Sequence, residues 1–220
     1  MPRLDAASSR LLLLALIPQL STITPPHLSS PPTPRSTPYR ALDCGAGIGR
    51  ITSSVLLPLF PIVDLVEPVP SFLAAANKHA AEAREGWKLT KVAPPGGVVR
   101  QVRLWQAGLQ YFDPSPARMA TGVEGGKVEL IAKVGEGEWP DEAEEWEGQK
   151  GLDVCWVQWC VGHLSHDQLV AFLKRAKAAL RRGQAGEVEG FVVVKENVCK
   201  DDDGDGAGAL FDEDDSSTTR

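Results

Sequence analysis

The sequence has few of the features that mark disulfide-bonded, metal-binding or membrane proteins. Only four of its 220 residues are cysteine, and no two of them stand at the spacing of metal ligands. We expect buried free thiols in a reducing compartment, the cytoplasm and also the nucleus. The apolar run 11–17 is too short to span a bilayer, Asp5 precedes it, and no clear small-residue cleavage site follows it. It therefore predicts a packed helix, and we expect no membrane partner.

Basic side chains are a minority, with 23 Lys and Arg against 29 Asp and Glu and a net charge of −6. The acids concentrate in residues 136–147 and 201–215, and no basic patch balances them. This distribution disfavours a nucleic-acid partner and favours a cationic one. Hydrophobic residues make up 43% of the chain, which is ordinary for a globular enzyme with one core. We expect a monomer.

The chain divides into an N-terminal part, residues 1–38, and a main domain, residues 39–220. The first part contains a predicted helix over 5–16 and a linker rich in Pro, Ser and Thr. The main domain alternates predicted strands and helices, which indicates an α/β fold with a parallel sheet and helices on both faces. The predicted strands are 39–42, 62–67, 98–105, 153–159 and 190–195, and the predicted helices are 51–57, 72–85 and 165–180. Ser71 is the predicted cap of the second helix, and Ser165 with Gln168 forms a predicted capping box at the start of the third. Residues 114–150 interrupt this rhythm and are interpreted as an insertion with a possible short ribbon over 128–134.

A glycine-rich turn follows the first predicted strand. Gly45, Gly47 and Gly49 allow a sharp turn that brings bare N–H groups to a ligand at a helix start. A dinucleotide fingerprint would need glycine at position 50, which is Arg50. Glycine at alternate positions, with Glu67 at the end of the next strand, is instead typical of S-adenosylmethionine (AdoMet) methyltransferases, where the carboxylate holds the ribose.

Other polar residues stand at the ends of the predicted strands. In an open parallel sheet these ends form one edge, where ligands bind. The candidates there are Gly45, Glu67, Gln110, Gln158, Trp159, His163 and Asn197. Because side chains alternate along a strand, Trp156 and Trp159 point to opposite faces. We expect Trp156 in the core and Trp159 at the rim.

Several segments together resemble the protein α-N-terminal methyltransferases. They are Leu42-Asp43-Cys44-Gly45-Ala46-Gly47-Ile48-Gly49-Arg50, Gly108-Leu109-Gln110, Trp156-Val157-Gln158-Trp159-Cys160-Val161-Gly162-His163-Leu164, Lys195-Glu196-Asn197 and residues 212–217. The resemblance implies a class I, Rossmann-like methyltransferase fold that uses AdoMet. It also implies methylation of the terminal amine of proteins that begin Xaa-Pro-Lys or Xaa-Pro-Arg. Relative to the family, we expect both ends to be incomplete, with the C-terminal antiparallel strands missing.

The resemblance also implies a role for individual residues. At the cofactor it implies Gly45, Gly47, Arg50 and Gln158 on the methionine side, with Arg50 on the carboxylate, Glu67 on the ribose, and Leu109 and Gln110 on the adenine. For the peptide it implies Trp159, His163 and Asn197 along a channel, and Asp212, Asp215 and Ser217 near the amine and the basic third residue.

The chemistry of amine methylation calls for such groups. An α-amino group has a pKa near 8, so a positioned acceptor must take its proton before it attacks a methyl group. His163 and Asp215 are the available acceptors, and no metal is required. The resemblance adds Asn197 to these catalytic residues. Residue by residue, simpler interpretations exist, such as a turn histidine for His163 and a solvated acidic tail for residues 212–215.

Two further functions stay open at this point. One is an AdoMet-dependent methyltransferase for another amine, such as a lysine side chain. The other is a non-catalytic AdoMet-binding protein. Methylation of an internal lysine would favour the first, and cofactor binding without any product would favour the second.

Overall fold

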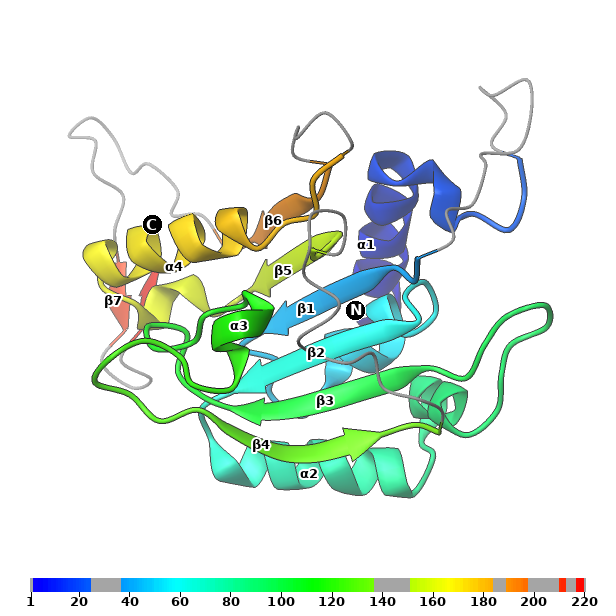
Figure 1. Ribbon diagram of the computed structural model, residues 1–220, viewed down its shortest axis with the longest axis horizontal. Coiled ribbons are helices and arrows are strands. Elements are labelled where there is room, and N and C mark those ends of the chain that lie inside the picture. The colour runs from blue at the N-terminus through cyan, green and yellow to red at the C-terminus, as the bar shows by residue number, and fades with distance from the viewer. Residues whose placement is uncertain are drawn as a thin grey trace.

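A six-stranded sheet forms the centre of the protein (Figure 1). The structure is a computed structural model, and it describes residues 2–24, 37–136, 151–183, 189–197, 210–212 and 217–219. The strands are β1 (Arg40–Cys44), β2 (Ile62–Glu67), β3 (Gln101–Gln106), β4 (Glu129–Val134), β5 (Val154–Gln158) and β6 (Phe191–Lys195). Their order is β4-β3-β2-β1-β5-β6, and every neighbouring pair is parallel except β3 and β4. The predicted α/β class with a mainly parallel sheet is confirmed.

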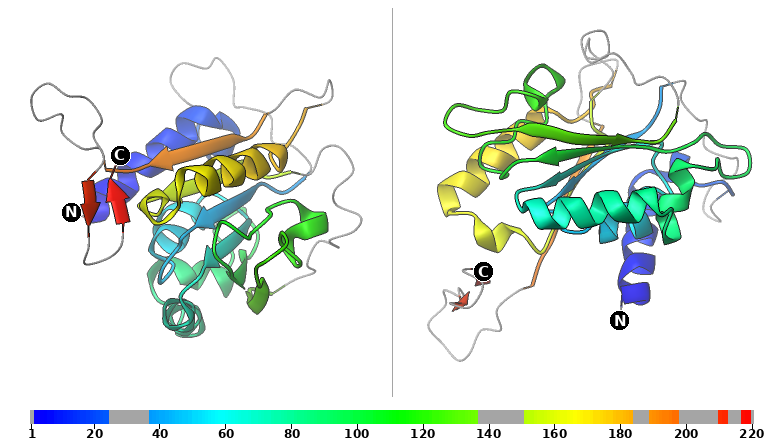
Figure 2. Two further views of the ribbon diagram at one scale, coloured as in Figure 1. Left: turned by 90° about the vertical axis from the view of Figure 1, so that its left-hand side faces the viewer. Right: turned by 90° about the horizontal axis from the view of Figure 1, so that it is seen from below.

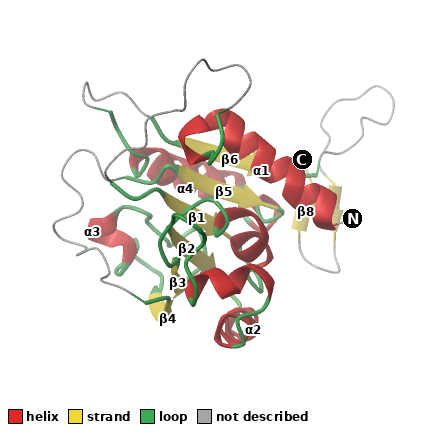
Figure 3. Cartoon of the chain, turned by 90° about the vertical axis from the view of Figure 1, so that its right-hand side faces the viewer, coloured by secondary structure: helices red, strands yellow, loops and turns green. Residues whose placement is uncertain are grey.

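Helices cover both faces of this sheet (Figure 3). On one face lie α1 (Pro2–Leu16), the π-helical turn η2 (Thr52–Leu56) and α2 (Pro70–Ala81). On the other lie α3 (Pro116–Met119) and α4 (His166–Ala178). Short 3-10 helices lie in the connections: η1 (Pro18–Leu20), η3 (Glu85–Thr90) and η4 (Val161–His163). None of the helices in these ranges has the length and apolar character to cross a bilayer.

Strand alternation produces two separate cores. In β5, Val154 and Trp156 face the core under α1 and α2, whereas Cys155 and Val157 face the core under α4. This follows from the two-residue repeat of a strand buried on both sides. Trp156 is fully buried and Trp159 is 49% exposed, so the predicted division between the two tryptophans is confirmed.

The helix boundaries differ in places from the sequence-based predictions. We expected α2 to begin at Phe72 with Ser71 as its cap, but it begins at Pro70, after Val69, and no side chain caps it. Proline suits the first helical turn because its φ is already helical and its missing N–H has no intrahelical partner there. For α4 the predicted cap is confirmed, because Ser165 and Gln168 form a reciprocal capping box.

Two strand assignments refine the prediction for the sheet edges. Residues 128–134, which we predicted as a possible ribbon, contain β4, the edge strand paired antiparallel with β3. β7 (Leu210–Asp212) and β8 (Ser217–Thr219) form a separate antiparallel pair, visible in red in Figure 2. β6 is therefore the other edge of the six-stranded sheet among the described residues. The boundaries at residues 38 and 39, and at 114 and 150, stay predictions.

Candidate functional site

The turn after β1 requires glycine at its first position. Gly45 has φ +60°, and a Cβ atom there would lie 2.5 Å from the Cβ of Cys160. The next residue, Ala46, donates its backbone N–H to the carbonyl of Val66 at 3.1 Å. The close approach of two strand ends therefore fixes the turn and leaves its far side open to a ligand.

Glu67 joins this turn to the end of β2. Its Oε2 accepts a hydrogen bond from the backbone N–H of Gly47 at 2.8 Å, and its Oε1 accepts one from Val69 at 2.9 Å. The side chain is buried, yet each carboxylate oxygen has a further lone pair. The predicted ribose acceptor thus stands at the turn in a fixed orientation.

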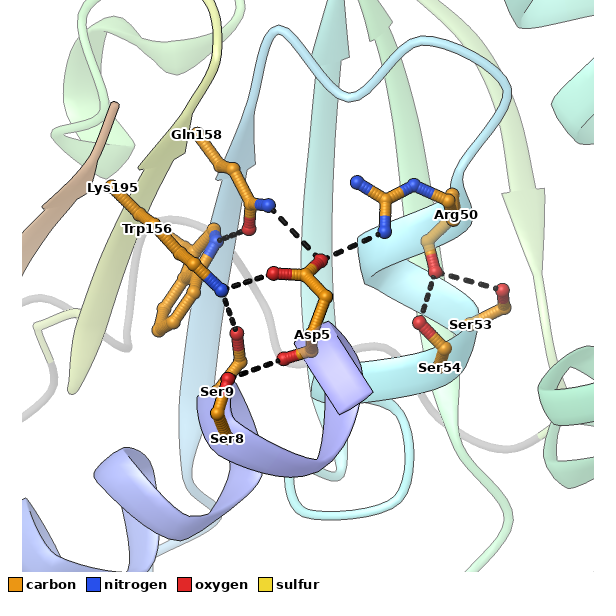
Figure 4. A network of polar contacts seen from close by, with 9 residues as sticks. All are labelled: Asp5, Ser8, Ser9, Arg50, Ser53, Ser54, Trp156, Gln158 and Lys195. Carbon is orange, nitrogen blue, oxygen red and sulfur yellow. Dashed lines mark hydrogen bonds and ion pairs between the residues drawn. The ribbon is translucent and has the colours of Figure 1, made fainter. Parts of the chain in front are cut away.

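The predicted methionine-side residues meet in a polar network that also includes α1 (Figure 4). Arg50 Nη1 donates to Asp5 Oδ2 at 3.1 Å, and Gln158 Nε2 donates to the same oxygen at 3.3 Å. Lys195 Nζ donates to Asp5 Oδ1. Trp156 Nε1 donates to Gln158 Oε1 at 3.0 Å, which sets the amide so that its nitrogen faces Asp5.

Electrostatics keep Asp5 ionised in this network. Partial burial alone would raise the pKa of the carboxyl group, but hydrogen bonds from Lys195, Arg50 and Gln158 outweigh it and lower the pKa below the ordinary value. The sequence-based reasoning missed Asp5 and Lys195 as site residues. Asp5 lies 45 positions from Arg50 and 190 from Lys195, and no local pattern in a leucine-rich helix indicates such contacts.

A third missed residue supports the predicted adenine loop. Arg175 of α4 donates from Nη2 to the carbonyl oxygens of Leu109 at 2.9 Å and Gln110 at 3.0 Å. Its Nε donates to the carbonyl of Phe112 at 3.0 Å. These three contacts join α4 to the loop after β3. Leu109 itself is buried, and Gln110 is partly exposed.

The predicted peptide-side residues cluster beyond the ends of β5 and β6. Trp159 adopts a left-handed backbone conformation with φ +56°, which is uncommon for a bulky residue and indicates a local constraint. Its ring stacks on the guanidinium of Arg50, with Arg50 Cζ 5.0 Å from the ring centroid. His163 in η4 and Asn197 after β6 are both exposed. Glu196 accepts a hydrogen bond from the backbone N–H of Val161 at 3.1 Å, which ties η4 to the end of β6.

The predicted acidic segment is only partly described. Asp212 in β7 is paired in register with Ser217 in β8, and β8 lies against η4, the turn that contains His163. The backbones of Ser217 and His163 are therefore on neighbouring elements. Asp215 lies outside the described residues.

A buried carboxyl group lies directly behind the glycine turn. Asp43 Oδ2 accepts a hydrogen bond from Thr52 Oγ1 at 2.6 Å. Burial raises the pKa of Asp43 to about 7, against the opposing effect of the Thr52 hydrogen bonds. Burial likewise raises the pKa of Cys160 to about 12, so this thiol stays protonated at neutral pH.

The arrangement suits an elongated ligand with a carboxylate at one end and a nucleoside at the other. Arg50 and Gln158 supply donors for the carboxylate, Glu67 supplies acceptors for ribose hydroxyls, and the loop at Leu109 supplies an apolar wall. Within the described ranges there is no group of three side chains that could hold a metal ion.

Comparisons with known proteins give a consistent result. The family model described as AdoMet dependent proline di-methyltransferase matches residues 31–121 and 98–220. N-terminal Xaa-Pro-Lys N-methyltransferase 1-B of Xenopus laevis is 34% identical over 180 residues, which are 82% of this chain and 54% of that protein. Alpha N-terminal protein methyltransferase 1 of Arabidopsis thaliana is 35% identical over 181 residues, 82% of this chain and 45% of that protein. The chain thus spans about half the length of these relatives.

One solved structure supports the fold. A SAM-dependent methyltransferase from Leishmania major superposes with a TM-score of 0.53 at 24% identity, and the match covers 98% of this chain and 56% of that one. At this identity the likeness supports the methyltransferase fold, and the choice of ligand rests on the site residues themselves.

Proposed function

The chain belongs to the family of AdoMet-dependent proline di-methyltransferases, and we propose that it transfers methyl groups from AdoMet to the α-amino group of proteins beginning Xaa-Pro-Lys or Xaa-Pro-Arg. One observation carries the proposal. Donors for a carboxylate at Arg50 and Gln158 and an acceptor at Glu67 lie along the same sheet edge as the exposed Trp159 and His163.

AdoMet, when bound, supplies a methyl group on a sulfonium centre that an amine can attack. When the cofactor is bound, Arg50 would hold the carboxylate at one end of it, and Glu67 would hold the hydroxyls of the ribose, which lies between its two ends. The glycine turn at Gly45 lets the backbone approach without a side chain in between. Leu109 and Gln110 border the adenine. In-line transfer then depends mainly on orientation.

On the peptide side, the residues remove a proton and orient the amine. His163 is exposed at the turn after β5, where its imidazole accepts the proton of the incoming ammonium. Asp215 shares this role, and Asn197 orients the amine. Trp159 packs against the first residues of the peptide, while Asp212 meets the basic third residue, with Ser217 nearby. A proline at the second position gives the peptide a fixed φ as it enters the channel.

The proposal is tested with two peptides of identical sequence beginning Ser-Pro-Lys, one with a free amine and one acetylated. The protein and methyl-labelled AdoMet are incubated with each peptide, and mass spectrometry locates the added mass. Methylation at the terminal amine of the free peptide, and none on the acetylated one, is the expected result.

A third peptide with Gln in place of Lys at its third position tests recognition of the cationic side chain. Because carboxylates bind a cation at close range, we expect a lower kcat/KM for this peptide. Equal labelling of the free and acetylated peptides contradicts the proposal. Labelling of an internal lysine would instead show a methyltransferase for another amine.

A further inference from the structure

Asp5 is the centre of the polar network at the predicted methionine end. Three donors from three different elements converge on its carboxylate: Arg50 after β1, Gln158 at the end of β5 and Lys195 at the end of β6 (Figure 4). We propose that Asp5 is a positioning residue, which orients Arg50 and Gln158 so that they bind the carboxylate end of the cofactor. This inference rests on the proposed function.

The geometry leaves Arg50 free to bind a second anion. Only its Nη1 donates to Asp5, and the other two nitrogens of the guanidinium are directed away from that carboxylate in Figure 4. Trp159 packs on the plane of the same group at 5.0 Å. Asp5 thus holds one nitrogen of the Arg50 guanidinium, and Trp159 covers one face of it. The remaining N–H groups keep a fixed orientation in which they can donate two hydrogen bonds to a carboxylate.

The charges support the same role. Arg50 and Lys195 are both cationic and approach the same carboxylate from opposite sides. Asp5 neutralises one of the two charges, so the network retains a net charge of +1, which matches one cofactor carboxylate. Without Asp5, the two cations would repel each other, and Arg50 would lose the contact that sets its orientation.

Asp5 is held in place by the docking of its helix. α1 buries Ala6 and Leu13 in the core shared with β1 and β5, and Ile17, directly after the helix, is buried in the same core. Ser9, one turn after Asp5, is also buried and accepts a hydrogen bond from Lys195 Nζ at 3.0 Å. Moving Asp5 away from Arg50 would therefore break its ion pairs and also expose the apolar side chains that α1 buries against the sheet.

The experiment compares two ligands that differ at the carboxylate end. S-adenosylhomocysteine has the amino-acid end, whereas 5′-methylthioadenosine has the same nucleoside and thioether without it. Calorimetric titrations are run on the unmodified protein and on Asp5→Asn. We expect Asp5→Asn to weaken S-adenosylhomocysteine about tenfold, about 1.4 kcal/mol, and to change methylthioadenosine less than about twofold.

Further variants serve as controls for the titrations. Asp167→Asn makes the same chemical change in the first turn of α4, at an exposed position, and we expect no effect on either ligand. In an Arg50→Gln background, Asp5→Asn should weaken S-adenosylhomocysteine less than it does in the unmodified protein, because the part of its effect that acts through Arg50 is already lost and only the part through Gln158 remains. Thermal unfolding of each variant confirms that the compared proteins are folded, and Asp5→Glu, which keeps the charge, should restore part of the affinity.

Several outcomes would overturn the inference. Equal weakening of both ligands would mean that Asp5 only supports the fold, and an unchanged affinity for S-adenosylhomocysteine would mean that it does not act on this end. Tighter binding after Asp5→Asn would mean that Asp5 competes with the cofactor carboxylate. If the unmodified protein binds neither ligand, the proposed function itself fails, and this result is separate from the other three.

Discussion

The two sides of the sheet rim differ in how firmly their side chains are held. On the cofactor side, Glu67 accepts two backbone hydrogen bonds, and Arg50 and Gln158 both donate to Asp5. On the peptide side, His163 and Asn197 are exposed, and neither side chain forms a hydrogen bond with another residue in the described part of the chain. The cofactor side is thus organised before any ligand arrives.

This difference matches the two proposed ligands. A cofactor of constant structure is bound best by groups that lose no further freedom, whereas a peptide that varies in sequence is met by side chains that become ordered with it. Substitutions on the cofactor side should therefore lower stability along with affinity. Substitutions on the peptide side should lower turnover and leave stability nearly unchanged.

The largest loss of stability is expected for Gly45→Ala. The new Cβ would lie 2.5 Å from Cys160 Cβ, and the backbone at φ +60° is unfavourable for alanine. Together these effects should lower the free energy of unfolding by about 3 to 5 kcal/mol. Gly47→Ala is the matched control, because its φ is +55° but no atom lies within 4 Å of the added Cβ. Urea unfolding that gives equal losses for the two variants would rule out the contact with Cys160.

The next largest effect is the change of the free energy of unfolding with pH that Asp43 causes. Its pKa rises from 3.8 in the unfolded chain to about 7 in the folded protein, so between these values the folded protein holds a proton that the unfolded chain has lost. The free energy of unfolding should therefore fall as the pH rises from 4 to 7, by up to about 4 kcal/mol from this group. The pKa of Asp64 is lowered, mainly by Arg103 against the effect of burial, so its ionisation changes stability in the opposite direction and cannot cause this fall.

Asp43→Asn tests this assignment. Asparagine keeps an oxygen that accepts the hydrogen bond from Thr52, and it carries no charge at any pH. Urea unfolding of this variant at a series of pH values should show a much smaller slope between pH 4 and 7 than the unmodified protein. Asp167→Asn, at an exposed site, should leave the slope as it is. A slope that persists in Asp43→Asn would assign the titration to another group.

Most of the fold was predictable because its signals are local. The alternating strands, the glycines at 45 and 47 and the capping box at Ser165 depend on residues close in the sequence. The common edge for Glu67 and Gln158 also followed, since parallel strands end on one side of a sheet.

The supports of the site were not predictable in the same way. The partners of Asp5 lie 45 to 190 positions away in the sequence, and those of Arg175 lie 63 to 66 positions away. Nothing in the segments around these two residues indicates their partners. The pairing of β4 with β3 was not predicted, because the sequence of a short strand inside a long irregular segment does not show which strand it pairs with. Tertiary packing determines these features.

Arg175→Met should have a smaller effect, divided between stability and affinity. Methionine fills a similar volume but leaves the carbonyls of Leu109, Gln110 and Phe112 without their charged donor. We expect the free energy of unfolding to fall by about 2 kcal/mol and S-adenosylhomocysteine to bind several-fold more weakly. Lys174→Met, one residue earlier and exposed, is the matched control. Stability lost without any change in affinity would separate Arg175 from the adenine loop.

The smallest effect on stability is expected for His163→Asn, on the peptide side. The side chain is exposed at the end of η4, so the free energy of unfolding should change by less than about 0.5 kcal/mol. If His163 takes the amine proton, kcat for a peptide beginning Ser-Pro-Lys should fall at neutral pH, and the loss should shrink at higher pH, where more of the amine is already neutral. His166→Asn, three residues later at the start of α4, should leave kcat unchanged.

A fall in kcat that is the same at pH 7 and pH 9 would assign His163 to peptide binding. A large loss of stability would show that the peptide side of the rim is held as firmly as the cofactor side.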